Sequence, residues 1–110
     1  MRVWSVDPKR LDDRRLLGEH AEIHAVHAVI TRRTRGYAAH PEVLRWHGHL
    51  SALVARHDRV AAEFATRGFD HRSPLRARGP VRAPRRLLSV AAELALLQQK
   101  GALIGGNPRP

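Results

Sequence analysis

Cysteine is absent from the 110 residues, and aromatic residues make up only 5% of them. Without a thiol the chain can form no disulfide, no zinc-thiolate site and no cysteine nucleophile. The scarcity of aromatic side chains leaves Leu, Val, Ile and Ala to build the core, and this composition favours helices over sheets. No apolar run approaches the roughly 18 residues of a membrane-spanning helix, and nothing resembles a secretory signal. We therefore expect a cytoplasmic protein with no membrane partner.

Acidic residues are also scarce. Ten Asp and Glu stand against 20 Lys and Arg, which gives a net charge of +10. The excess is concentrated in residues 72–110, where eight basic residues accompany one acidic residue, while residues 1–71 hold twelve basic and nine acidic ones. Such a charge attracts polyanions, of which a phosphate backbone is the commonest in the cytosol. The alternative is a disordered basic tail on an unrelated core.

Apolar periodicity predicts an all-α, compact single domain of about three helices over residues 1–110. Residues 1–12 are expected to form an extended lead-in, because Pro8 breaks an early helix and Asp12 or Asp13 is placed to cap the next one. The first helix is predicted over about 13–31, where Leu16, Ile23 and Ile30 form one stripe.

A second helix is predicted from Pro41 to Gly68, because apolar residues alternate at spacings of four and three. This stripe comprises Trp46, Leu50, Leu53, His57, Val60 and Phe64. Prolines and glycines between residues 68 and 84 predict a loop, of which 76–84 is a basic arm. The last helix is expected over 85–100, and residues 101–110 are expected to be a frayed tail. The face predicted to be buried in the last helix comprises Leu87, Val90, Ala91, Leu94 and Leu97.

Histidine is abundant, with eight residues. His20, His24 and His27 share one predicted helix, and two histidines four residues apart can bind the same metal ion. However, there is no HExxH pattern, metal sites usually take ligands from more than one element, and the many nearby arginines oppose a cation. We therefore predict no metal site and favour interior or interfacial positions for His20, His27 and His57.

The common catalytic motifs are missing, since there is no glycine-rich phosphate loop and no GxSxG elbow. The remaining candidate nucleophile is the α-amine of Met1. An α-amine has an unperturbed pKa of about 7.7–8.0, so part of it is neutral near pH 7, and nearby arginines lower that pKa further. A neutral amine can attack an electrophilic sugar carbon and form an imine.

Three sequence blocks resemble a known family. The motifs LLGEHAE, HPEVLRW and RGFDHRSPL occur in this order within residues 1–75. They resemble the pyrimidine-dimer DNA glycosylase family of the phage endonuclease V type. The similarity after residue 75 is loose.

The resemblance implies a compact helical fold and a DNA repair enzyme that works without a cofactor on double-stranded DNA with damaged bases. In the family, the terminal amine displaces the damaged base and forms a Schiff base, and β-elimination then cuts the strand. The family's catalytic amine corresponds to Met1 and its catalytic glutamate to Glu22, while Glu19 matches an acidic position expected to be structural. A nucleoid-associated location and no obligatory protein partner follow as expectations.

Arginines are the expected DNA contacts. Arg2 matches the family arginine after the amine, and basic residues of the first helix, the following turn and the arm are candidate phosphate contacts. The predicted DNA-binding set is Arg2, Arg14, Arg15, Arg32, Arg33, Arg35, Arg72, Arg76 and Arg78. The chain departs from the family at Ala21, where members usually carry arginine. Two alternatives remain open: a non-catalytic basic DNA-binding module on the same scaffold, and a metal-binding helical protein.

Overall fold

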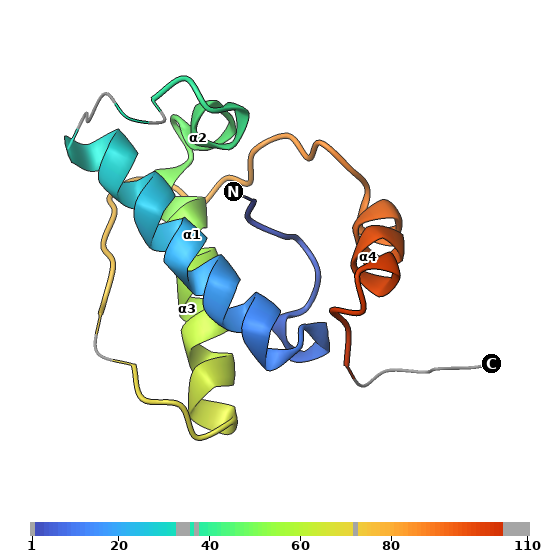
Figure 1. The fold of residues 1–110 in the computed structure, drawn as a ribbon. Helices are drawn as coiled ribbons and strands as arrows, with labels where there is room; N and C mark the ends of the chain where they lie inside the picture. Colours follow the sequence, from blue (N-terminus) through green and yellow to red (C-terminus); the bar gives the residue numbers. More distant parts are fainter. Residues whose placement is uncertain (1, 33–35, 37, 72, 105–110) are drawn as a thin grey trace.

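The two longest helices form the centre of the molecule. Helix α1 (Asp13–Arg32) packs against α3 (Leu50–Thr66), and the short α2 (Pro41–Trp46) lies near the C-terminal end of α1 (Figure 1). A 3-10 turn, η1 (Pro8–Arg10), precedes α1, and α4 (Val90–Gln99) follows a long connection. The computed structural model describes residues 2–32, 36, 38–71 and 73–104. The predicted all-α single domain is confirmed: within these ranges the only strand-like pairing is an isolated bridge between Leu11 and Leu103.

The boundaries of α1 follow the sequence signals. The Asp12 carboxylate accepts a hydrogen bond from the Arg15 backbone at 2.8 Å, so Asp12 caps the helix as expected. Leu16 and Ile23 of the predicted stripe are fully buried. Because Ile30 is only partly buried, the C-terminal end of α1 is less deeply packed than its centre.

The predicted second helix is in fact two helices. Gly48 adopts a positive φ of 78° between α2 and α3, a conformation that ends a helix and that glycine adopts without a steric penalty. The predicted apolar stripe is buried on both sides of this turn, since Trp46 of α2 and Leu53, Val60 and Phe64 of α3 are all buried. The spacing of apolar residues thus predicted the buried face but not the turn within it.

The last helix is shorter than predicted, and only part of its predicted face is buried, since Val90 and Leu94 pack partly buried against the core whereas Ala91 is exposed. It begins at Val90, after Ser89 caps it by accepting a hydrogen bond from the Ala92 backbone. Leu87, expected in the core, precedes the helix and is 63% exposed. Leu97 is buried as predicted, but its buried companion is Glu93. The reason is that Glu93 accepts a hydrogen bond from the Ser5 backbone at 2.6 Å.

The tail is not frayed where the structure describes it. Ala102 is buried, and its carbonyl accepts a hydrogen bond from the Asp12 backbone at 2.8 Å. The Ile104 N–H donates to the Arg10 carbonyl at 2.7 Å. Residues 102–104 therefore pair with the lead-in, and this part of the prediction was wrong. The rest of the predicted tail, 105–110, lies outside the described residues.

Buried glutamates from three helices hold the lead-in in place. The carboxylate of Glu42 in α2 accepts a hydrogen bond from the Val3 backbone at 2.5 Å. Glu19 in α1 binds the backbone of Trp4 in the same way, and Glu93 binds Ser5 as described above. These three consecutive amides lie next to Arg2, so their bonds fix the course of the chain at the start of the molecule.

Arginines neutralise two of these buried carboxylates. Arg56 donates to Glu19 through two nitrogens, at 2.6 and 2.8 Å, and also to the Val6 carbonyl at 2.6 Å. Arg45 donates to Glu42 at 2.7 and 3.0 Å and to the Val3 carbonyl at 2.9 Å. Each arginine thereby binds both a carboxylate and the lead-in, which satisfies charges that would otherwise be costly to bury.

The ion pair between Glu42 and Arg45 leads to a prediction about the stability of the fold. Burial would raise the pKa of Glu42, but hydrogen bonds from Arg45 and from the Val3 backbone outweigh burial, so the pKa lies below its ordinary value of 4.5. Glu42→Gln should lower the free energy of unfolding by about 2–3 kcal/mol near neutral pH. The pKa of Glu42 is lowered in the folded state only. The difference in the free energy of unfolding between wild type and Glu42→Gln is therefore at its full size above pH 4.5 and becomes smaller as the pH falls below that value.

Urea denaturation of both proteins across this pH range measures the difference. Asp13→Asn is the control, because the Asp13 side chain is 67% exposed in its pair with Arg67, and its loss should cost less than about 1 kcal/mol. A difference between wild type and Glu42→Gln that stays constant as the pH falls would contradict the prediction.

Candidate functional site

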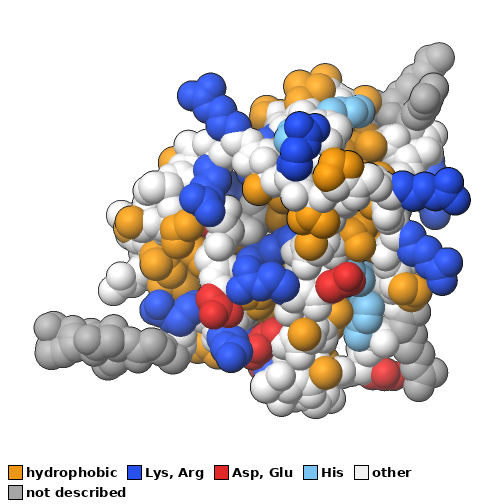
Figure 2. Space-filling model, turned by 180° about the vertical axis from the view of Figure 1, so that it is seen from behind, with side chains coloured by type: hydrophobic (Ala, Val, Ile, Leu, Met, Phe, Trp, Pro, Cys, Tyr) orange, Lys and Arg blue, Asp and Glu red, His pale blue; other side chains and the backbone are white. Residues whose placement is uncertain are grey.

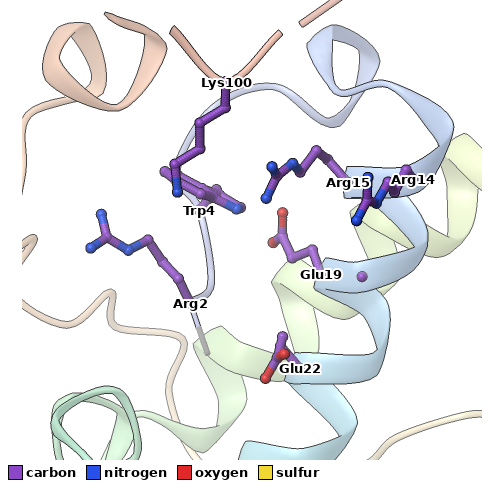
Figure 3. A pocket seen from close by; sticks show the side chains of 8 residues that line it. Arg2, Trp4, Arg14, Arg15, Glu19, Glu22 and Lys100 are labelled. Carbon is purple, nitrogen blue, oxygen red and sulfur yellow. The ribbon is translucent and has the colours of Figure 1, made fainter. Parts of the chain in front are cut away.

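A pocket of about 410 Å³ lies between the lead-in, the N-terminal half of α1 and the end of α4. Its lining residues are Arg2, Trp4, Arg14, Arg15, Gly18, Glu19, Glu22 and Lys100. Figure 3 shows Arg2, Trp4 and Lys100 on one side of this pocket and the α1 residues on the other. The pocket therefore brings together two segments that lie almost 100 residues apart in the sequence.

The two carboxylates that line the pocket differ in their burial and in their hydrogen bonds. The Glu19 side chain is fully buried and bound to Arg56, so its oxygens are engaged in structural bonds. Burial raises the pKa of Glu19, while the hydrogen bonds and positive charge of Arg56 act in the opposite direction. Glu22, one turn further along α1, is partly exposed on the pocket wall. Of the two, Glu22 is therefore the carboxylate that is accessible from the pocket.

Four basic residues surround these carboxylates, namely Arg2, Arg14, Arg15 and Lys100. The Arg2 guanidinium lies 5.1 Å from the centre of the Trp4 ring, within the range of a cation–π contact, and Trp4 is itself buried. This contact holds the Arg2 side chain at the pocket. A concave site lined by cations concentrates positive potential and favours a polyanion such as a phosphate backbone.

The basic arm follows the surface of the helices. Its backbone carbonyls are hydrogen-bonded by side chains of the folded body. His27 bonds to the carbonyl of Arg76 at 2.9 Å, Ser51 to that of Arg78 at 2.9 Å, and His49 to that of Arg82 at 2.8 Å. The side chains of these three arginines are exposed. Figure 2 shows Lys and Arg side chains spread over the face of the molecule opposite to that seen in Figure 1.

The structure gathers some of the predicted site residues and separates others. Arg2, Arg14, Arg15 and Glu22 meet in the pocket. Arg32 and Arg76 line a different cavity, of about 520 Å³, between α1 and the arm. Arg78 lies further along the arm beside α3. The predicted residues that lie outside the described ranges are Met1, Arg33, Arg35 and Arg72.

A family model described as pyrimidine dimer DNA glycosylase matches residues 1–77, which is more than half of the chain. The chain belongs to the pyrimidine dimer DNA glycosylase family. The family therefore indicates DNA as the substrate and DNA repair as the process. A search of curated proteins found no significant match, and a search of solved structures found none either. No helix among the described residues is sufficiently long and apolar to span a bilayer.

Two residues that line this pocket were not predicted from the sequence, namely Trp4 and Lys100. Trp4 was assigned only to an extended lead-in, and Lys100 only to the end of the last helix. Lys100 lies beyond the region matched by the family model, as does Glu93, which anchors Ser5. No short-range pattern connects these residues to Glu22, because the contact depends on the return of α4 to the lead-in. The bias towards basic residues after position 72 was the available signal.

The chain departs from the family pattern at Ala21, which is next in sequence to a residue that lines this pocket. Ala21 is exposed on α1, directly before Glu22. Of the predicted DNA contacts in α1 and the following turn, Arg14 and Arg15 line the pocket, whereas Arg32 lines a different cavity and Arg33 is outside the described residues. Lys100 adds a cation that the sequence did not predict. The pocket is thus basic despite the alanine.

Lys100 gives a prediction about DNA binding, because the chain has only two lysines. Lys100→Ala should weaken binding to a short duplex by up to about tenfold at low salt and reduce the slope of log K against log salt by about 0.9, the loss of one phosphate contact. Lys9→Ala removes the same charge from the 3-10 turn, outside the pocket, and is the matched control. Fluorescence anisotropy over a salt series measures both slopes. Equal slopes for the two variants would show that Lys100 has no special role.

Proposed function

We propose that the chain is a pyrimidine-dimer DNA glycosylase with apurinic/apyrimidinic lyase activity, acting through the amine of Met1 and the carboxylate of Glu22. The observation that carries this proposal is the pocket beside the lead-in, whose lining includes Glu22 together with Arg2 and Lys100, in a chain of this family. A peptide bond joins Met1 to Arg2, and the backbone of residues 3–5 is fixed by buried glutamates.

The proposed reaction has two stages. The neutral amine attacks C1′ of the 5′ nucleotide of the dimer, the bond from C1′ to the base breaks, and its electron pair leaves with the base. The amine loses a proton, the bond from C1′ to O4′ opens with protonation of O4′, and an imine results. Loss of a proton from C2′ then expels the 3′ phosphate by breaking the bond from C3′ to O3′. Hydrolysis of the imine releases the amine.

Glu22 has two tasks in this scheme. Its negative charge stabilises the cationic sugar-imine, and its oxygens accept and return the protons that move during ring opening and elimination. Glu19 is unsuited to these tasks because Arg56 and the Trp4 backbone already occupy its oxygens. The functional difference between the two glutamates thus follows from their partners.

The basic residues position the DNA. Arg2, Arg14, Arg15 and Lys100 lie close enough to the pocket to contact phosphates near the lesion, and the exposed arginines of the arm extend this surface. Reaching a base within the stack requires a kinked duplex and an extruded nucleotide, and phosphate contacts on both sides of the lesion favour that distortion. The proposed partner is therefore double-stranded DNA with damaged bases.

Borohydride trapping tests the covalent step. The protein is incubated with a duplex containing an abasic site in the presence of borohydride, which reduces an imine to a stable amine. We expect a protein–DNA adduct, with mass spectrometry of the digested adduct locating the added mass on Met1. Binding without any adduct would favour the alternative of a non-catalytic DNA-binding module, and an adduct on a lysine would assign the reaction to a different amine.

Replacement of Glu22 tests the acid–base step. Glu22→Gln should preserve duplex binding and slow strand cleavage at an abasic site by at least about a hundredfold, the scale of a positioned acid–base group. The control is Asp13→Asn, which removes an exposed carboxylate from the first turn of the same helix. Single-turnover cleavage assays on both variants give the comparison. A Glu22→Gln protein that cleaves at the wild-type rate would remove Glu22 from the mechanism.

A further inference from the structure

Four histidine rings meet on the side of α1 that faces away from Glu22. His20 and His24 come from α1, His57 from α3, and His71 from the segment after α3. Helical geometry places residues 20 and 24 on one face of α1 and residue 22 on the opposite face. The spacing in the sequence groups His20 and His24 with His27, on one helix. The structure replaces His27 by two histidines from other segments.

The spacing of the four rings suits a common ligand. One nitrogen of each ring lies within 4.8 Å of the corresponding nitrogen of the other three. The Nε2 atoms of His20 and His24 are 3.2 Å apart. In a tetrahedral zinc site with Zn–N bonds of about 2.0–2.1 Å, neighbouring ligand atoms are separated by about 3.3 Å. Ring movements on the order of 1 Å therefore suffice to complete such a site.

Two of the histidine nitrogens in this cluster have no hydrogen-bond partner among the described residues. The Nε2 atoms of His57 and His71 are buried and form no hydrogen bond with the described protein. On the other side of the His57 ring, Nδ1 lies 3.0 Å from the carboxylate of Asp58. A proton on Nδ1 donated to Asp58 leaves a lone pair on Nε2, directed at the cluster. Carboxylates orient metal-binding histidines in this way.

The surroundings of His20 and His24 favour the neutral ring, which is the form that binds a metal. Burial, followed by the neighbouring histidines, lowers the pKa of His20 to about 4. Burial also lowers the pKa of His24, with His57 as the next cause. The ring of Phe64 lies 4.9 Å from His20 and 6.0 Å from His71 and supplies an apolar wall.

We propose that His20, His24, His57 and His71 bind one divalent first-row transition metal ion, with zinc as the best fit to four imidazole ligands from three segments. The ion joins α1 and α3 to the start of the segment that leads into the basic arm. Its role is structural, because the four histidines leave no open coordination position and lie across α1 from the pocket. The proposal is independent of the glycosylase mechanism.

Metal titration of the full chain tests this site. Protein purified without a histidine tag and stripped with a chelator is titrated with zinc against a chromophoric competitor, and elemental analysis gives the stoichiometry. We expect one zinc per chain. His71→Ala and His24→Ala should each weaken zinc binding at least about a hundredfold, and Asp58→Asn about 10–100-fold. His47→Ala, which removes an exposed histidine outside the cluster, should bind as wild type.

Two further readings make the result decisive. Cobalt in the same site should give the intense visible absorption of tetrahedral coordination, lost in His71→Ala. Zinc at about 100 times its dissociation constant should raise the melting temperature by on the order of 10 °C. Circular dichroism checks that each stripped variant is folded. A folded wild-type chain that takes up no stoichiometric zinc, or His24→Ala and His71→Ala proteins that bind zinc as wild type does, would overturn the proposal.

Discussion

Three buried carboxylates that each accept a backbone N–H from the lead-in are the interaction on which the rest of the site depends. Glu42, Glu19 and Glu93 bind the amides of residues 3, 4 and 5 in order, and they belong to α2, α1 and α4. An extended segment outside any sheet has no backbone partners of its own, so its amides must find side-chain acceptors when it is buried. The glutamates supply these acceptors, and Arg45 and Arg56 neutralise the charges of Glu42 and Glu19.

The same constraint gives two glutamates of α1 different surroundings. Glu19 and Glu22 are three positions apart and line the same pocket. One faces the interior, where an arginine and a backbone amide take its oxygens, while the other faces the pocket and is partly exposed. A single helix can therefore anchor the lead-in with one glutamate and leave the carboxylate of another accessible from the pocket. The basic arm shows a similar division between backbone and side chains. Its carbonyls form hydrogen bonds with side chains of α1 and α3, and its arginine side chains are exposed.

Local patterns in the sequence predicted the elements well and their long-range contacts poorly. The stripe in α1, the Asp12 cap and the helix end at Gly68 follow from neighbouring residues, and the structure shows them. The turn at Gly48 was hidden, because apolar residues continue in phase across it. Glu93 was misjudged because a carboxylate ordinarily marks an exposed face, and only its distant partner Ser5 makes burial favourable. For the same reason, histidine spacing along one helix could not show that His57 and His71 join His20 and His24.

The bond between Ser5 and Glu93 joins residues 88 positions apart. During synthesis the lead-in emerges long before α4 exists, so the Ser5 backbone N–H gains its carboxylate acceptor only after Glu93 has been synthesised. Closing so large a loop is entropically costly and comes late in folding. The pocket, with Lys100 contributed from the end of α4, is consequently completed only after residue 100 has been synthesised, and a product that terminates before α4 would lack this wall of the pocket.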